Sequence, residues 1–80
     1  MIEIHLTDED ESPKVFTDLD GTIRLRMSWH TGIDEALDSS SEQISPEVKD
    51  SFRSLFRDRE IRREFDKTNK VLVIRPSRND

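Results

Sequence analysis

Apolar and polar residues alternate over the first six positions of the chain, with Ile2, Ile4 and Leu6 on one side. This period of two is typical of a β-strand that has one buried face. Residues 7–13 follow with four consecutive acids and a proline, which cannot donate to a sheet ladder. We therefore expect a strand and then an exposed loop.

Two further strand-like runs flank Asp20 and Gly21, over residues 14–19 and 22–29. Asp-Gly favours a two-residue type I′ turn, because both turn positions need positive φ. This turn predicts a hairpin in which Phe16 faces Leu25. The residues on its apolar face would be Phe16, Ile23, Leu25, Met27 and Trp29.

A three-residue loop with Gly21 in a left-handed bulge is the alternative register. It would place Val15 and Thr17 beside Ile23 and Leu25 instead. We prefer the two-residue turn, and the competing register stays open.

The segment after this hairpin predicts a short helix and then a main helix. Ile33, Ala36 and Leu37 have helical spacing over barely two turns, and Ser39 to Ser41 then indicate a linker. Ser45 suits an N-cap, and Pro46 suits the first helical position, where its missing N–H is not needed. We predict the main helix from about residue 46 to residue 68.

The apolar residues of this main helix do not form one stripe. Val48, Phe52, Leu55 and Phe56 fall within a sector of about 100°, but Ile61 and Phe65 fall almost opposite to it. Either the helix breaks near Asp58, which could cap a second helix, or it is continuous and offers two apolar faces to two partners.

The run from Val71 to Ile74 is continuously apolar, as in a central strand covered on both faces. We predict one small α+β domain over residues 1–75, followed by a polar tail over residues 76–80. The domain has a mostly antiparallel sheet of about four strands, with the main helix packed across one face. We expect the first and last strands to be neighbours.

Composition places the chain at the polar edge of globular proteins. Its 80 residues are 31% hydrophobic and 39% charged, so one small core has to stabilise it, and help from a partner or a second copy is expected. There is no cysteine, no secretory leader and no apolar run of about 20 residues. We expect a soluble cytoplasmic protein that does not interact with membranes.

The net charge of −5 is unevenly distributed along the chain. Residues 1–40 carry ten acids and three bases, and residues 41–80 carry eight acids and ten bases. The halves therefore differ, at −7 and +2, and offer different surfaces to a charged partner.

The stretch KVFTDLDGTI, residues 14–23, resembles the first motif of the haloacid dehalogenase superfamily. The resemblance implies that Asp18 would be a phosphoryl-accepting nucleophile beside Mg²⁺, with Asp20 as general acid and base. That family also needs a parallel sheet, a later Ser or Thr, a Lys and an acidic pair. The rest of this chain does not supply them, so we expect a turn at this stretch and no enzyme.

No cofactor or metal site is predicted elsewhere. His5 and His30 lack the companions of a metal centre, and Gly21 and Gly32 are the only glycines, too few for a phosphate-binding loop.

The segment that follows Lys49 is basic and offers a second class of function. Its arginines could meet nucleic-acid phosphates if they project together. These arginines are Arg57, Arg59, Arg62 and Arg63. Acids lie among them at spacings that allow helical ion pairs, such as Asp58 with Arg62, so a solvated, salt-bridged surface is the simpler interpretation.

We therefore predict a non-enzymatic protein-binding module, an adaptor or inhibitor of a larger assembly. A more specific version is that the acidic first half imitates nucleic acid, as small phage-encoded inhibitors do, through Asp8, Glu9, Asp10 and Glu11. Trp29, Ile61 and Phe65 are candidate apolar contacts, and the arginines could grip an acidic partner. A nucleic-acid-binding accessory protein and a homodimer are the alternatives.

Overall fold

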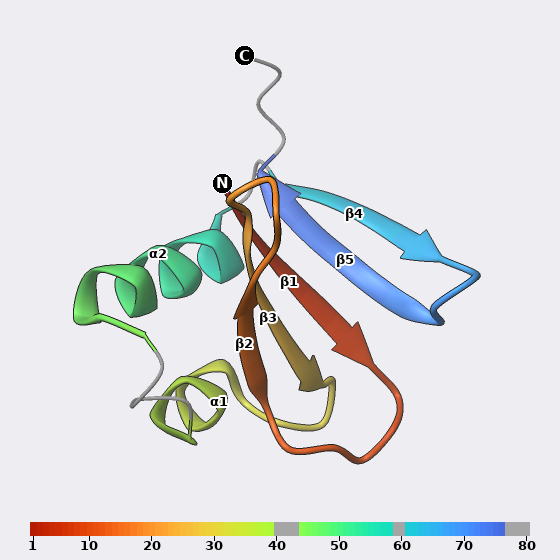
Figure 1. Cartoon of the computed structure of the whole chain (residues 1–80). Helices are drawn as coiled ribbons and strands as arrows, with labels where there is room; N and C mark the ends of the chain where they lie inside the picture. Colours follow the sequence, from red (N-terminus) through yellow and green to blue (C-terminus); the bar gives the residue numbers. More distant parts are fainter. Residues whose placement is uncertain (40–43, 59–60, 77–80) are drawn as a thin grey trace.

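The computed structural model describes residues 1–39, 44–58 and 61–76. Five strands form one mixed sheet, and two helices lie on one side of it (Figure 1). The elements are β1 (Ile2–Thr7), β2 (Lys14–Thr17), β3 (Ile23–Ser28), α1 (Ile33–Ser39), α2 (Pro46–Arg57), β4 (Ile61–Asp66) and β5 (Val71–Pro76). This confirms the predicted α+β fold, with five strands rather than about four.

Strand β1 lies at the centre of the sheet, whose order is β2-β3-β1-β5-β4. It pairs in parallel with β3 and antiparallel with β5, so the predicted contact between the first and last strands is confirmed. The loop after β1 carries the chain to the far edge as β2, and the hairpin then inserts β3 between β2 and β1. The parallel β1–β3 pair was not predicted.

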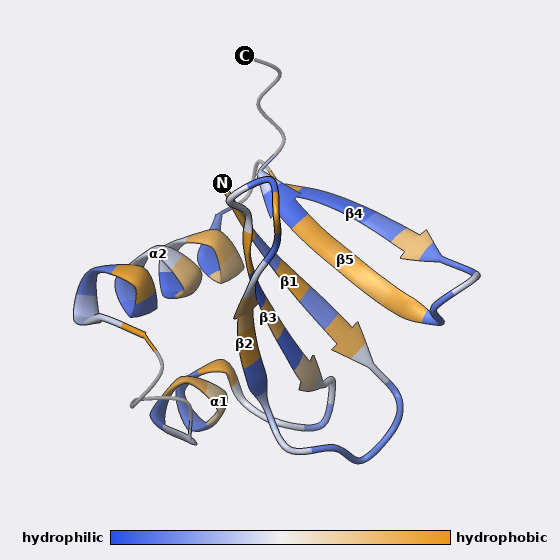
Figure 2. Ribbon diagram, in the orientation of Figure 1, coloured by the Kyte–Doolittle hydropathy of each residue, from blue (hydrophilic) through white to orange (hydrophobic). Residues whose placement is uncertain are grey.

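The core lies between the sheet and the helices. Ile4 of β1 and Phe52 of α2 are fully buried there. Its buried members are Ile4, Leu25, Met27, Ala36, Leu37, Phe52, Leu55 and Ile74. Each large side chain buried in this way stabilises the fold by about 1.5–3 kcal/mol relative to its exposed state. Figure 2 shows the apolar stretch of β5, whose predicted central position is confirmed by its place between β1 and β4.

Helix α2 begins as predicted but ends earlier. The Ser45 hydroxyl accepts the backbone N–H of Val48 at 3.4 Å, and Pro46 takes the first helical position. The helix stops at Arg57, and Asp58 is already extended, with φ −65° and ψ 136°. Neither described helix is long and apolar enough to cross a membrane.

The prediction of a helix through residue 68 is therefore wrong, and so is the prediction of a second helix after Asp58. Residues 61–66 form strand β4, paired antiparallel with β5. The out-of-phase Ile61 and Phe65 follow the period of two along this strand, and β5 supplies the backbone partners that an extended segment needs. The helical spacing on which the predicted ion pairs were based is therefore not present in residues 61–66.

The preferred register of the β2–β3 hairpin is also wrong. Val15 pairs with Leu25 and Thr17 with Ile23, which is the three-residue-loop alternative. Among the described residues only Gly21 and Lys70 have positive φ, so Asp20 does not adopt the conformation that a type I′ turn needs. Phe16 consequently pairs with Arg24, on the sheet face away from the helices.

That second sheet face, called here the open face, is held by ion pairs around Glu3. The Glu3 side chain is only 8% exposed and lies 3.0 Å from Arg24 Nε, 3.1 Å from His5 Nε2 and 3.5 Å from Arg75 Nε. Burial alone would raise its pKa. The hydrogen bond from His5 and the charges of Arg75 and Arg24 outweigh burial and lower the pKa of Glu3 below its ordinary value.

We expect Gly21→Ala to destabilise the protein by about 1 kcal/mol, because Gly21 has a φ of +85° that costs an L-residue free energy. No atom lies within 4 Å of the added methyl group, so the cost is conformational rather than steric. Gly21→Asn is the control and should lose less, since Asn tolerates this region. Equal losses for Ala and Asn in urea unfolding would contradict this explanation.

We expect Glu3→Gln to cost about 1–3 kcal/mol at pH 7, because it removes the acceptor of a nearly buried, charge-assisted network. Since the folded pKa is lowered, this stabilisation is present above the unfolded pKa of about 4.3 and is lost as the pH falls through the folded value. Stability of the variant should therefore fall less between pH 5 and acidic pH than that of the wild type.

Urea unfolding at several pH values measures both effects of Glu3→Gln. Glu64→Gln is the matched control, because the Glu64 side chain is 50% exposed and should matter by less than about 0.5 kcal/mol. Parallel pH profiles for the wild type and Glu3→Gln would show that Glu3 does not carry this dependence.

Candidate functional site

An apolar groove lies on the helix side of the sheet, where no residue of α1 or α2 lines it. Its floor comes from three neighbouring strands, because Leu6 of β1 pairs with Leu72 of β5, and Leu72 pairs with Phe65 of β4. Paired residues project on the same face of a sheet. The floor therefore continues the apolar face of the core beyond the area that the helices cover.

Trp29 borders this floor. Its backbone N–H donates to the Thr7 carbonyl at 2.9 Å, which extends the β1–β3 ladder by one residue. The Trp29 side chain is 60% exposed, and its ring centroid lies 4.0 Å from that of His30. The aromatic ring is thus fixed at the end of the sheet by its backbone while most of its surface meets solvent.

The groove has a volume of about 690 Å³. The residues that line it are Leu6, Thr7, Asp8, Trp29, Phe65, Lys67, Lys70 and Leu72. This volume lies within the range of about 300–1,000 Å³ that is usual for ligand sites. Half of the lining residues are aliphatic or aromatic, and the charged groups at the border come from one acid and two lysines.

The two lysines belong to the β4–β5 turn, whose shape is set by Asp66. The Asp66 carboxylate accepts the backbone N–H groups of Thr68 and Asn69 at 3.0 and 3.2 Å, and the Asn69 side-chain amide at 2.7 Å. The bonds from Asn69, followed by that from Thr68, lower the pKa of Asp66. Lys70 closes the turn with a φ of 55°.

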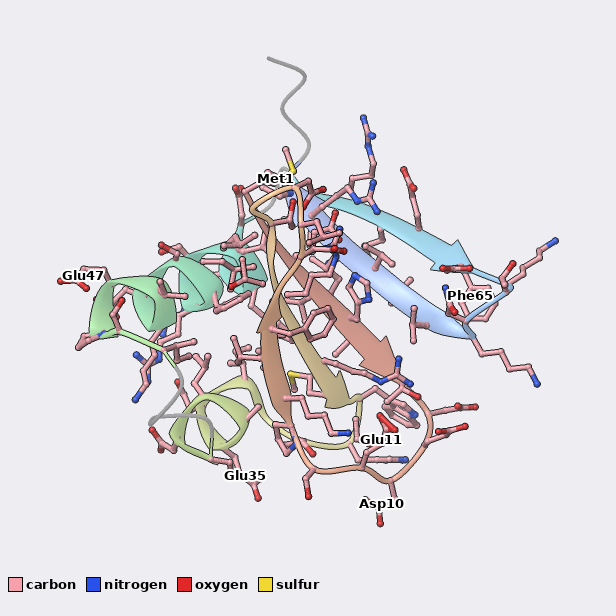
Figure 3. The ribbon with its side chains drawn as sticks, in the orientation of Figure 1. Met1, Asp10, Glu11, Glu35, Glu47 and Phe65 are labelled. Atoms are coloured by element: carbon pink, nitrogen blue, oxygen red, sulfur yellow. The ribbon has the colours of Figure 1, made fainter. Side chains whose placement is uncertain are left out.

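The structure brings together two of the predicted apolar contacts and separates the third. Trp29 and Phe65, which is 61% exposed, both line the groove. Figure 3 shows Phe65 near the end of β4 that leads into the turn. Ile61 lies at the other end of that strand and packs against the core.

The predicted acidic contacts do not act as one group. Asp8 lines the groove, and Glu9 and Asp10 are exposed in the loop after β1. Glu11 is half-buried and pairs with Arg26 at 2.7 Å. The proposed imitation of nucleic acid therefore depends on three exposed carboxylates in one loop.

The described arginines of the basic segment do not all project together. Arg57 ends α2, whereas Arg62 and Arg63 are neighbours in β4 and point to opposite faces of the sheet. Arg59 lies outside the described residues, as do residues 40–43 of the predicted linker and residues 77–80 of the predicted tail.

The two carboxylates of the phosphatase-like stretch have structural partners in the hairpin turn. Asp18 accepts the Leu19 N–H at 2.7 Å and pairs with Arg24, and Asp20 accepts the Thr22 N–H at 2.9 Å. These bonds to the Thr22 backbone and side chain lower the pKa of Asp20. Across the described residues, no three His, Asp or Glu side chains converge as metal ligands would.

Sequence reasoning missed five residues of the groove, namely Leu6, Thr7, Leu72, Lys67 and Lys70. Leu6 and Leu72 were predicted only as strand residues, and their meeting depends on the β1–β5 pairing. The turn-forming segment between Asp66 and Val71 was a usable signal for the lysines, since a tight turn there would have placed both beside Phe65.

The groove suits apolar contact with a ligand, and its border is charged. No model of a protein family matches the chain, and neither a curated protein nor a solved structure matches it. Its function is therefore inferred from the residues of the groove.

Proposed function

We propose that this protein is a non-enzymatic protein-binding module, an adaptor or inhibitor, that binds its partner through the groove of Trp29, Phe65, Leu6 and Leu72. The observation that carries the proposal is the joint exposure of two large aromatic side chains over an apolar floor built by three strands. Solvated apolar surface of this kind is a recurrent mark of an interaction site.

The energy available from these side chains is large for a chain of this size. A tryptophan or phenylalanine buries about 150–250 Å² when covered. With about 60% of each side chain exposed, covering one would remove about 100 Å² from water, worth about 2.5 kcal/mol. Aromatic anchors in a desolvated pocket are the usual hot spots of protein interfaces.

The electrostatics of the open face favour a protein partner over nucleic acid. Four arginines of that face pair with four carboxylates, so their charges are locally compensated. The arginines are Arg24, Arg26, Arg62 and Arg75, and the acids are Glu3, Glu11, Asp18 and Glu64. A phosphate backbone binds best to cations that have no competing carboxylate.

We expect Trp29→Ala and Phe65→Ala each to weaken partner binding by at least tenfold, since each removes an anchor of the kind that costs about 2 kcal/mol or more. The measurement is quantitative capture from a nuclease-treated lysate of the source organism, with tagged wild type and variants compared side by side. Stability should change little, because both side chains are mostly exposed.

Phe56→Ala is the matched control, because Phe56 is a 40% exposed phenylalanine of α2 that does not line the groove. It should retain the partner. A partner retained equally by Trp29→Ala, Phe65→Ala and Phe56→Ala would place the interface elsewhere. Nucleic acid that is captured without nuclease and lost with it would support the nucleic-acid alternative instead.

A further inference from the structure

The groove is the uncovered part of a helix-packing surface. α1 and α2 already pack on this face of the sheet, and the β4–β5 hairpin extends away from them (Figure 1). The floor residues Leu6 and Leu72 continue the face that carries Ile4 and Ile74 beneath α2. An element packed over the floor would therefore occupy the same layer as the two helices, and a helix is the element that suits this layer.

The border of the groove carries a charge preference. Lys67 and Lys70 flank the β4–β5 turn, and among the described residues neither makes an ion pair. The nearest acid of the turn, Asp66, is occupied by three hydrogen bonds within the turn. Asp8 lies at the part of the groove formed by β1. The hairpin side is therefore basic and the β1 side acidic.

Lys70 occupies a backbone conformation that its side chain does not favour. Its φ of 55° is left-handed, a region in which Gly or Asn would cost less. A lysine kept at such a position carries a conformational cost without any compensating ion pair in the described structure. A contact of its positive charge with a partner would explain why a lysine occupies this position.

From these observations we infer that the partner presents an amphipathic helix whose apolar face fills the groove and whose acidic flank lies against Lys67 and Lys70. This inference rests on the proposed function and adds the chemistry of the partner. Helix-in-groove recognition uses apolar anchors at i, i+3 or i+4, and i+7. The lysines fix the direction of the helix, because carboxylates on the other flank would meet Asp8.

A second copy of this chain is the competing occupant. Its own charged borders could pair basic side to acidic side across a two-fold axis. However, two hollow surfaces of about 690 Å³ would then face each other, which leaves the floor residues without close contacts. A convex helix gives the better fit.

Peptide selection on the immobilised full chain tests the inference. The library holds 16-residue peptides with leucine fixed at four positions of helical spacing and every other position random. Selected peptides should be enriched in Asp and Glu on one flank. By calorimetry at low salt, their affinity should fall about tenfold with the double variant Lys67→Gln/Lys70→Asn, in which Asn tolerates the left-handed position.

Lys14→Gln is the matched control, because Lys14 is an exposed lysine of β2 that does not line the groove. It should change the affinity less than twofold. Peptides lost with Trp29→Ala but without acidic enrichment would overturn the acidic partner and leave the proposed function standing. Peptides whose affinity is unchanged by Trp29→Ala would overturn both proposals.

Failure to select any peptide would also overturn the inference. Sedimentation of the same preparation then identifies the competitor. A concentration-dependent dimer that Phe65→Ala dissociates would assign the groove to a second copy, and a monomer would leave the groove without a protein ligand.

Discussion

Coverage of the sheet is the constraint on which this fold depends. Helices of 7 and 12 residues are about 10 and 18 Å long, and each is about 10 Å wide. Five strands of up to six residues make a surface of about 24 by 20 Å. Two such helices cannot cover one face of this sheet, still less both. One face must therefore be stable in contact with water, and part of the other must stay uncovered or be covered by a partner.

The open face meets this constraint with charge. Glu3 holds Arg24, Arg75 and His5 around one nearly buried carboxylate, and Arg24 also reaches Asp18 of the hairpin turn. The aliphatic stems of the arginines cover the strands, and their guanidinium groups lie near carboxylates. This arrangement stabilises a face with few apolar residues, and it leaves little uncompensated charge for an outside ligand. The groove on the other face differs, because it has two exposed aromatic rings and two lysines without an ion pair in the described part of the chain.

Local sequence patterns predicted the elements whose signals do not depend on pairing. Three signals can be interpreted from neighbouring residues alone. They are the alternation from Ile2 to Leu6, the helix cap at Ser45 and the apolar run that begins at Val71. Residues 61–66 were wrongly predicted as helix because IRREFD contains mostly residues with fair helix propensity. Pairing with β5 overrides that preference and makes this segment a strand. The phase conflict of Ile61 and Phe65 was the available sign of this error. The hairpin register was wrongly predicted because Asp-Gly suits both a two-residue turn and a three-residue loop. Only the backbone conformation of Asp20 distinguishes the two.

The candidate site could be predicted only in part for the same reason. Trp29 was chosen as a large aromatic at a strand end, and Phe65 because it was out of phase in the predicted main helix. Their common location is set by strand order, which places β1 beside β5 and β5 beside β4. The same order brings Lys67 and Lys70 to the border of an apolar floor. Selection for stability alone would favour Gly or Asn at position 70 and a smaller polar residue in place of each exposed ring. The chain departs from both preferences at one location, and the proposed binding surface would account for this departure.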